Sequence, residues 1–210
     1  MTSKPALILA FAAVAAAVPT MTPPQAAAAP CSDVEVVFAR GTNEPPGLGS
    51  VGGPFVEDLR ARVAPRTVAA TPVDYLATND FNVSTPAGTD AARSLIESIA
   101  GSCPNTKMVL GGYSQGAAVI EKATNEASPQ VSEHVAATAL FGTPLTSFSG
   151  LLAAGQALPM LAPQYAANSI AQCNEGDPIC WEGGWDMGAH VSYVQSGKVA
   201  QAADFAASRL

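Results

Sequence analysis

The sequence predicts an α/β protein, in which a parallel β-sheet is covered by helices on both faces. Short apolar runs rich in β-branched residues alternate along the chain with longer segments whose apolar side chains recur at helical spacing. The chain has 210 residues, enough for one domain with a substantial core, and neither an internal repeat nor a linker-like stretch divides it. We therefore expect a single doubly covered sheet.

The N-terminal segment predicts an export signal. Lys4 is the only charged residue before Asp33, and Ala6–Val18 is apolar throughout, followed by a proline and a run of small residues. The apolar segment is short for a membrane span, although an uncleaved anchor helix is the alternative. We expect residues 1–29 to be a signal peptide and residues 30–210 to form one exported domain without a transmembrane anchor.

The first half of that domain begins with a predicted strand over residues 34–39, which is rich in β-branched and aromatic side chains. A loop rich in glycine and proline follows over 41–53. Apolar side chains at helical spacing predict a helix over 54–63, and a second strand, broken at Pro72, is predicted over 67–75. The polar stretch 78–89 predicts a loop.

The second half continues the same alternation. A helix is predicted over 90–100, where a glycine stops it, and the central strand and its helix extend to about residue 125. The remaining predicted elements are a strand over 135–141, a helix over 149–158, a strand over 169–172 and a helix over 198–209. In such a sheet, ligands bind beyond the C-terminal ends of the strands.

The chain carries 17 acidic and ten basic residues, a net charge of −7, and loss of Lys4 with the signal would make it more acidic. It contains no basic cluster, which argues against nucleic acid and anionic membrane surfaces as partners. We expect a monomer that is secreted or associated with the cell wall.

The four cysteines predict two disulfides, because an even number in an exported chain usually pairs. Of the three pairings, Cys173 with Cys180 would close one tight loop and leave Cys31 for Cys103. No pair has C-x-x-C spacing and the chain has only two histidines, so neither a metal nor any other cofactor is expected.

The central apolar run ends in Gly112-Tyr113-Ser114-Gln115-Gly116, which fits G-x-S-x-G. In α/β-hydrolases this pattern is a sharp turn from strand to helix, with the serine at its apex as the nucleophile. By itself the pattern is weak, since a glycine-rich strand end with a buried serine looks the same. The interpretation as a nucleophile depends on a base and an acid later in the chain.

The candidate base is His190, because in α/β-hydrolases the chain order is serine, acid, histidine. His134 lies too close to Ser114 for an acid-bearing loop to intervene, and we expect it to be a partly exposed structural residue. The first candidate acid is Asp177, which lies inside the proposed loop between Cys173 and Cys180 and immediately before a proline. The other acids ahead of the histidine are Glu175, Glu182 and Asp186, of which Asp186 is the second choice.

An oxyanion hole requires a backbone N–H from the residue after the nucleophile, which is Gln115. The second donor usually comes from the loop after an early strand. Thr42 lies in that loop and can offer both its N–H and its hydroxyl, although it could also be an ordinary turn residue.

Four segments together resemble one known family: Phe38–Thr42, Gly112–Gly116, Cys173–Cys180 and Ala189–Tyr193. They are similar to the cutinase family, in particular to cutinase-like esterases exported by mycobacteria and related actinobacteria. The resemblance covers the chain from Cys31 to its end. It implies an α/β-hydrolase with a five-stranded parallel sheet, no large lid and an exposed active site.

The resemblance also implies roles for individual residues. Ser114, Asp177 and His190 would form the triad, with Thr42 and Gln115 in the oxyanion hole, and Cys31 would pair with Cys103 and Cys173 with Cys180. The implied activity is hydrolysis of carboxylic esters through an acyl-enzyme on the serine. Short- to medium-chain acyl esters are the expected substrates, and lipids or cutin-like polyesters are further candidates.

Trp181 and Trp185, which precede the histidine, are candidate substrate-binding residues, although bulky aromatic side chains are more often part of a core. Two other functions remain as alternatives, an acetylxylan esterase of the same family and a non-catalytic exported surface protein. The segment Gly47–Gly52 fits a dinucleotide-binding pattern, but its glycines begin several residues past the strand. A serine β-lactamase is less consistent, since Ala117 stands where S-x-x-K requires lysine.

Overall fold

Five parallel strands form one sheet in the computed structural model, which describes residue 2 and residues 31–210. The predicted signal peptide therefore lies, apart from one residue, outside the described residues. The sheet order is β2-β1-β3-β4-β5, with β3 at the centre. The strands are β1 (Val34–Ala39), β2 (Val68–Pro72), β3 (Lys107–Tyr113), β4 (Val135–Phe141) and β5 (Ser169–Gln172).

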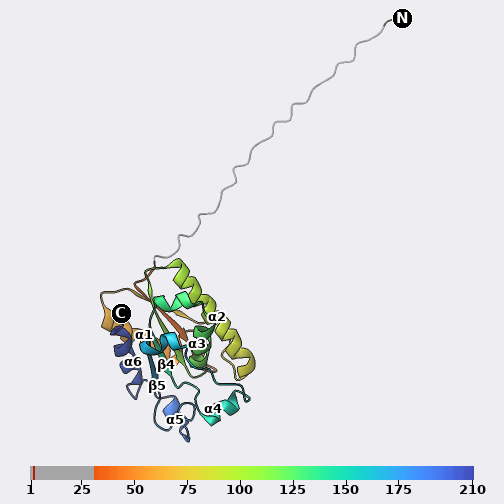
Figure 1. Cartoon of the computed structure of the whole chain (residues 1–210), viewed down its shortest axis with the longest axis vertical. Helices are drawn as coiled ribbons and strands as arrows, with labels where there is room; N and C mark the ends of the chain where they lie inside the picture. Colours follow the sequence, from red (N-terminus) through yellow and green to blue (C-terminus); the bar gives the residue numbers. More distant parts are fainter. Residues whose placement is uncertain (1, 3–30) are drawn as a thin grey trace. The chain divides into compact units, whose positions relative to one another are not determined.

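Helices cover both faces of this sheet, as predicted. Figure 1 shows α1 (Gly49–Val63) and α6 (Lys198–Ala207) on one side of the strands, with α2 (Phe81–Ser102) and α3 (Gln115–Glu126) on the other. Each side has its own apolar core between helices and sheet. The shorter helices are η1 (Pro129–His134), α4 (Ser147–Leu152), η2 (Pro163–Asn168) and α5 (Met187–His190).

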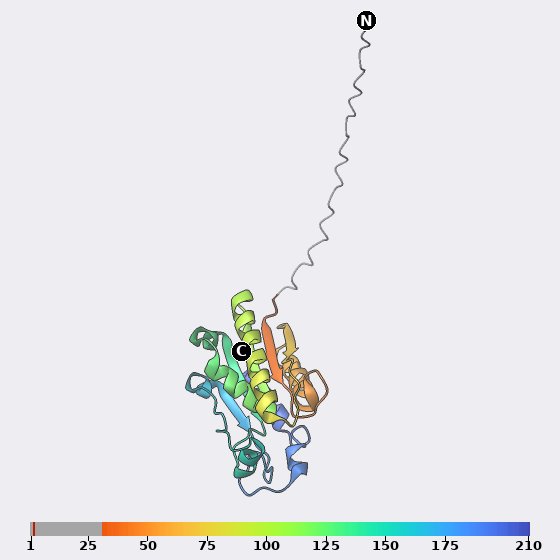
Figure 2. The ribbon, with the colours of Figure 1, turned by 90° about the vertical axis from the view of Figure 1, so that its right-hand side faces the viewer.

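The strand predictions agree closely with the structure, and β1, β4 and β5 have the predicted bounds. The second strand ends at Pro72, where the sequence predicts a break, and does not resume as a strand after it. Parallel pairing brings the C-terminal ends of all five strands to the same edge of the sheet. Figure 2 shows this arrangement from the side, with α4 and α5 beyond that edge.

The loop predicted over 78–89 is wrong, because α2 begins at Phe81 and continues for 22 residues. Its glycine, proline, serines and threonines resemble a loop, yet several of them serve helix packing. A Cβ on Gly88 would lie 2.8 Å from side-chain atoms of both Tyr75 and Val119, so only glycine permits this approach. Small residues here indicate a close helix contact.

The bounds of three other helices differ from the prediction. Helix α1 begins at Gly49 instead of Pro54, and its Gly52 lies directly against Phe38, where a Cβ would come within 2.5 Å of the ring. In place of the helix predicted over 149–158, the structure has the shorter helix α4, which starts at a capping box formed by Thr146 and Ser149 and ends at Leu152. The closing helix α6 ends two residues earlier than predicted.

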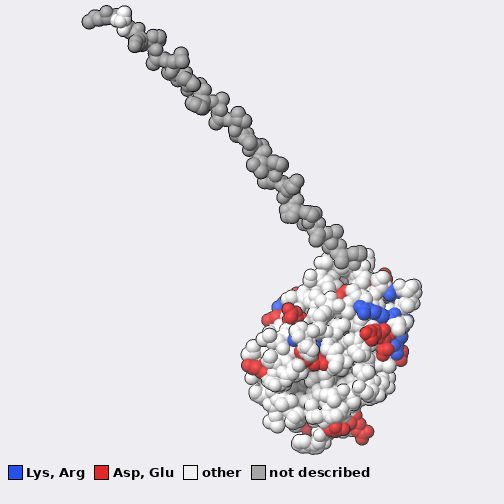
Figure 3. Space-filling model, turned by 180° about the vertical axis from the view of Figure 1, so that it is seen from behind, with Lys and Arg blue, Asp and Glu red and all other residues white. Residues whose placement is uncertain are grey.

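One disulfide joins the start of the described domain to the end of α2, and a second closes a short loop before α5. Cys31 is bonded to Cys103, and Cys173 to Cys180, the pairs that the resemblance implies. Among residue 2 and residues 31–210, no helix is long and apolar enough to cross a bilayer. Figure 3 shows one face of the domain, where basic side chains stand next to acidic ones and wide areas are uncharged.

Candidate active site

Ser114 lies at the turn where β3 ends and α3 begins. Its backbone has φ 55° and ψ −120°, a strained conformation for a residue with a side chain. The turn is crowded on both sides: a Cβ on Gly112 would lie 2.3 Å from the carbonyl oxygen of Gly116, and one on Gly116 would lie 2.0 Å from that of Ala39. Both glycines of the motif are therefore required by close backbone contact.

Three candidate residues from distant segments form one hydrogen-bonded chain at this turn. Nε2 of His190 lies 3.0 Å from Oγ of Ser114. Nδ1 of the same ring lies 2.8 and 2.9 Å from the two carboxylate oxygens of Asp177. Asp177 is fully buried and His190 is 5% exposed, whereas Ser114 is partly accessible. This geometry allows the imidazole to take the serine proton while the carboxylate orients the ring.

The carboxylate of Asp177 accepts further hydrogen bonds from the hydroxyl of Tyr193 at 2.6 Å and from the N–H of Ile179 at 2.8 Å. Burial raises the pKa of Asp177, but hydrogen bonds from His190 and Tyr193 lower it by more, so the net pKa lies below its ordinary value. Burial raises the pKa of Tyr193, which stays protonated and donates. The acid therefore remains ionised in a buried position.

The histidine is held by its own neighbours. The ring of Tyr113 stacks on the His190 ring at 5.1 Å between centroids, and its hydroxyl donates to the His190 carbonyl at 2.8 Å. The side chain of Asn174 donates to the carbonyl of Ala189 at 2.7 Å, which ties the disulfide-closed loop to the short helix α5. These contacts fix the imidazole from both the backbone and the ring face.

The other titratable candidates have different roles. Asp186, the second choice for the acid, caps the N-terminus of α5, where its Oδ1 accepts a hydrogen bond from Gly188 at 2.7 Å. His134 is partly exposed at the end of η1, just before β4 begins. The predicted partial exposure of His134 is thus confirmed, and its structural role stays a prediction.

The two candidate oxyanion donors meet beside the serine. The hydroxyl of Thr42 lies 3.5 Å from the side-chain oxygen of Gln115, the first residue of α3. First-turn N–H groups of a helix have no partner within the helix, so the N–H of Gln115 is free to face a substrate oxygen. The side-chain amide of Gln115 donates through Nε2 to the carbonyl of Thr78 at 3.2 Å and to the hydroxyl of Thr85 at 3.3 Å.

The loop that carries Thr42 is anchored by two residues that the sequence reasoning did not assign. Glu44 accepts from the N–H of Gly41 at 2.6 Å and from that of Ser50 at 2.8 Å. The buried guanidinium of Arg40 donates to the carbonyls of Glu44, Val73 and Tyr75. Local sequence gives little signal for the role of Arg40, since Val73 and Tyr75 lie far along the chain.

An apolar pocket opens beside Ser114 between the first turns of α2 and the segment after α4. Its walls come from the part of α2 that was predicted as a loop and from residues that follow the shortened α4. The pocket is lined by Phe81, Asn82, Thr85, Pro86, Ser114, Gln115, Ala118, Lys122, Pro144, Ser149, Leu152, Ala153, Gln156, Ala157, Leu158, Pro159 and Ile179.

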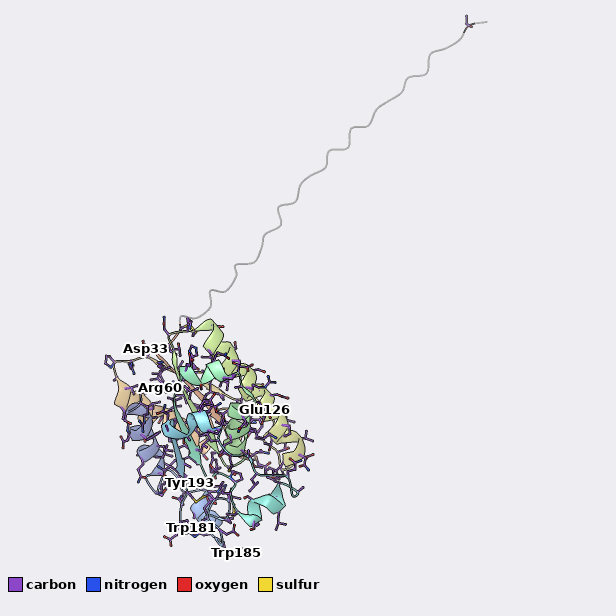
Figure 4. The ribbon with its side chains drawn as sticks, viewed as in Figure 1. Asp33, Arg60, Glu126, Trp181, Trp185 and Tyr193 are labelled. Atoms are coloured by element: carbon purple, nitrogen blue, oxygen red, sulfur yellow. A yellow bond between two sulfur atoms is a disulfide. The ribbon has the colours of Figure 1, made fainter. Side chains whose placement is uncertain are left out.

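Neither candidate tryptophan is part of this lining. Trp181 is 47% exposed and Trp185 is 86% exposed. Figure 4 places both at the end of the domain that carries α4 and α5, with Trp185 at the tip. Their exposure argues against the alternative that they are core residues, and a role in substrate binding stays a prediction. The segment between Cys180 and His190 runs over the surface, so its indoles have no core to enter.

Comparisons of the chain with known proteins give one consistent result. A family model described as Cutinase matches residues 30–210. Carboxylesterase Culp1 of Mycobacterium tuberculosis is 50% identical over 181 residues, which cover 86% of this chain and 83% of the relative. Phospholipase Culp4 of the same organism is 44% identical over 215 residues, covering 96% and 90%.

Solved structures give the same fold. A Trichoderma reesei cutinase in complex with a phosphonate inhibitor aligns with a TM-score of 0.66 at 31% identity, covering 86% of this chain and 77% of that one. The catalytic core of an acetyl xylan esterase from the same organism aligns with a TM-score of 0.71 at 24% identity, covering 86% and 100%. The second likeness is one of fold alone.

Proposed function

The chain belongs to the cutinase family of ester hydrolases, and we propose that it is an exported serine esterase with Ser114 as nucleophile, His190 as base and Asp177 as the orienting acid. The observation that carries this proposal is the continuous hydrogen-bonded chain from the serine Oγ through the imidazole to the buried carboxylate. A non-catalytic surface protein would have no need for a strained serine at the end of this chain.

The reaction would proceed by two acyl transfers. His190 takes the proton from Ser114, whose oxygen attacks the ester carbonyl and forms a tetrahedral intermediate. The N–H of Gln115 and the donors of Thr42 hold the oxyanion. The imidazole then gives its proton to the leaving alcohol, which leaves an acyl-enzyme. Water, activated by the same ring, attacks the acyl group and releases the carboxylic acid and the serine.

The decisive experiment is covalent labelling with a fluorophosphonate probe followed by peptide mapping. A relative of this chain binds a phosphonate inhibitor, and an activated serine should react with such a phosphorus centre. We expect one label, on Ser114. Ser114→Ala should not be labelled, and its kcat should fall by about 10⁶-fold. Ser147→Ala, an exposed serine at the start of α4, is the matched control and should keep both. Labelling elsewhere, or full activity of Ser114→Ala, would refute the proposal.

The proposed substrates are short- to medium-chain acyl esters, with lipids as further candidates. The largely apolar pocket beside the serine supports an aliphatic acyl group, and the relatives include a carboxylesterase and a phospholipase. Rates on p-nitrophenyl esters of rising chain length should pass through a maximum as the acyl chain fills the pocket. Preference for acetyl esters, together with release of acetate from acetylated xylan, would instead support an acetylxylan esterase.

We also propose that residues 1–29 direct export and are removed. Two disulfides in the described domain are consistent with an oxidising compartment outside the cytoplasm. The mass and N-terminal sequence of protein recovered from culture medium test this directly. A mature chain that begins near residue 30 is expected, whereas an intact Met1 in the extracellular protein would contradict cleavage.

A further inference from the structure

The pocket follows one face of helix α3 away from the nucleophile. Ser114, Ala118 and Lys122 all line it, and their spacing of four residues places them on the same side of the helix. A rise of 1.5 Å per residue puts Lys122 roughly 12 Å along the helix axis from Ser114. The two residues are therefore well separated along one wall of the same pocket.

Lys122 is the only charged residue among the seventeen that line the pocket. The rest are apolar side chains or neutral polar ones, and no carboxylate is included. The chain as a whole has 17 acidic and ten basic residues, so a random position would more often be negative. The one formal charge available to a bound acyl group is thus positive.

No carboxylate neutralises this ammonium group. Within the described range 31–210, Lys122 forms neither an ion pair nor a side-chain hydrogen bond. Its neighbour Glu121 is buried, and burial raises the pKa of that carboxyl to about 8, so the group is uncharged near neutral pH. Glu126, one turn further along the helix, does not come within ion-pair distance. Lys122 itself is half-buried and lines the pocket.

We propose that Lys122 is a specificity residue that binds a carboxylate at the far end of the acyl chain, so that esters of ω-carboxy acids are preferred substrates. The proposal rests on the proposed role of Ser114. An aliphatic spacer that spans roughly 12 Å would cover the separation of the two residues along the helix. Leu152 and Leu158 also line the pocket, which favours methylene groups over a polar headgroup.

The test compares three p-nitrophenyl esters of equal length whose acyl chains end in a methyl, a carboxylate or a trimethylammonium group. Wild-type protein, Lys122→Gln and Lys122→Glu are assayed, with Lys198→Gln as a control at the start of α6, outside the pocket. For the carboxylate ester, Lys122→Gln should lower kcat/KM by roughly three- to tenfold, mainly through KM, since the contact is remote from the reacting atoms.

The remaining variants, esters and salt concentrations test whether the effect depends on charge. Lys122→Glu should prefer the trimethylammonium ester, and in Lys122→Gln the methyl ester should lose less kcat/KM than the carboxylate ester. The wild-type preference for the carboxylate ester should also fall as ionic strength rises. An equal ratio of carboxylate to methyl rates in wild type and Lys122→Gln, or a wild-type ratio that ignores salt, would overturn the proposal. Loss of all three activities in wild type would instead refute the serine esterase assignment, and this proposal with it.

Discussion

The hydroxyl of Tyr193 donates a 2.6 Å hydrogen bond to Oδ2 of Asp177, the same oxygen that lies 2.8 Å from Nδ1 of His190. Both the phenol and the carboxylate are fully buried. Negative charge on this oxygen is therefore shared between two donors. The tyrosine holds the carboxylate in place and also limits how strongly it can attract the imidazole proton.

Tyr193→Phe should remove the hydrogen bond to Asp177 while keeping the aromatic ring in place. The carboxylate would then favour the protonated imidazole more strongly, so we expect the acid limb of the kcat/KM profile to move to higher pH by about half a unit or more. A two- to tenfold loss of kcat near neutral pH should accompany it. Tyr165→Phe is the matched control, because its buried hydroxyl has no partner within the described domain. An unshifted limb in Tyr193→Phe would show that the contact is only structural.

The same variant should alter acid stability. The pKa of Asp177 lies below its ordinary 3.8, so its ionisation stabilises the fold above that value, and the stabilisation disappears as pH falls through the lower folded pKa. Tyr193→Phe removes one of the hydrogen bonds that lower the pKa of Asp177, so this pKa rises toward its ordinary value. Its melting temperature should therefore be below wild type at pH 7, and the gap should narrow below about pH 3.8. Thermal unfolding of both proteins from pH 7 to below about pH 3.8 measures this difference in melting temperature. A difference that stays constant over this pH range would contradict the prediction.

Glu44 should matter for catalysis through the loop it anchors. Its two oxygens hold the N–H groups of Gly41 and Ser50, on either side of the segment that presents Thr42. Glu44→Gln replaces one acceptor by a donor, so we expect about a tenfold fall in kcat with a smaller change in KM, below the 10²–10³ expected for loss of an oxyanion donor. Glu57→Gln, exposed on α1, serves as the control. Equal kinetics for both variants would remove Glu44 from this role.

The two disulfides should differ in what they support, one mainly the stability of the domain and the other mainly its activity. Cys31 and Cys103 are 72 residues apart, and Cys173 and Cys180 only seven apart. Loop-closure entropy then assigns about 4 kcal/mol of stability to the long loop and about 2 to 3 kcal/mol to the short one. The short loop carries Asp177, so Cys173→Ser with Cys180→Ser should lower kcat more than Cys31→Ser with Cys103→Ser. Denaturant midpoints and kcat for the two double variants test this, and the reverse order in kcat would refute it.

Glu121 should make stability fall as pH rises. It is 4% exposed, its Oε2 lacks a partner within the described domain, and burial raises its pKa from 4.5 to about 8. Folding therefore favours the neutral acid, so stability is fully present below pH 4.5 and decreases until the pH passes about 8. Glu121→Gln should match wild type within about 1 kcal/mol at pH 4.5 and exceed it by a few kcal/mol at pH 8.5. Urea midpoints at both values measure the difference, and a pH-independent difference would contradict the assignment.

The sequence by itself determined the strands and the candidate residues Ser114, Asp177 and His190. Apolar runs such as β1 and β4 identify buried strands because a sheet covered on both faces needs continuous apolar segments. Parallel strands end at one edge, so residues that follow them along the chain meet there, even when they are distant in sequence.

Only the tertiary structure decided the shape of the pocket and the support of the triad. The first half of α2 reads as a loop, because Gly88 is required by contacts with Tyr75 and Val119 that no local pattern shows. The bond from Tyr193 to Asp177 likewise joins residues whose approach depends on how α5 and the disulfide loop fold together. Local composition fixes where chain segments become apolar or turn, whereas close packing between segments decides which of them meet and what lies between them.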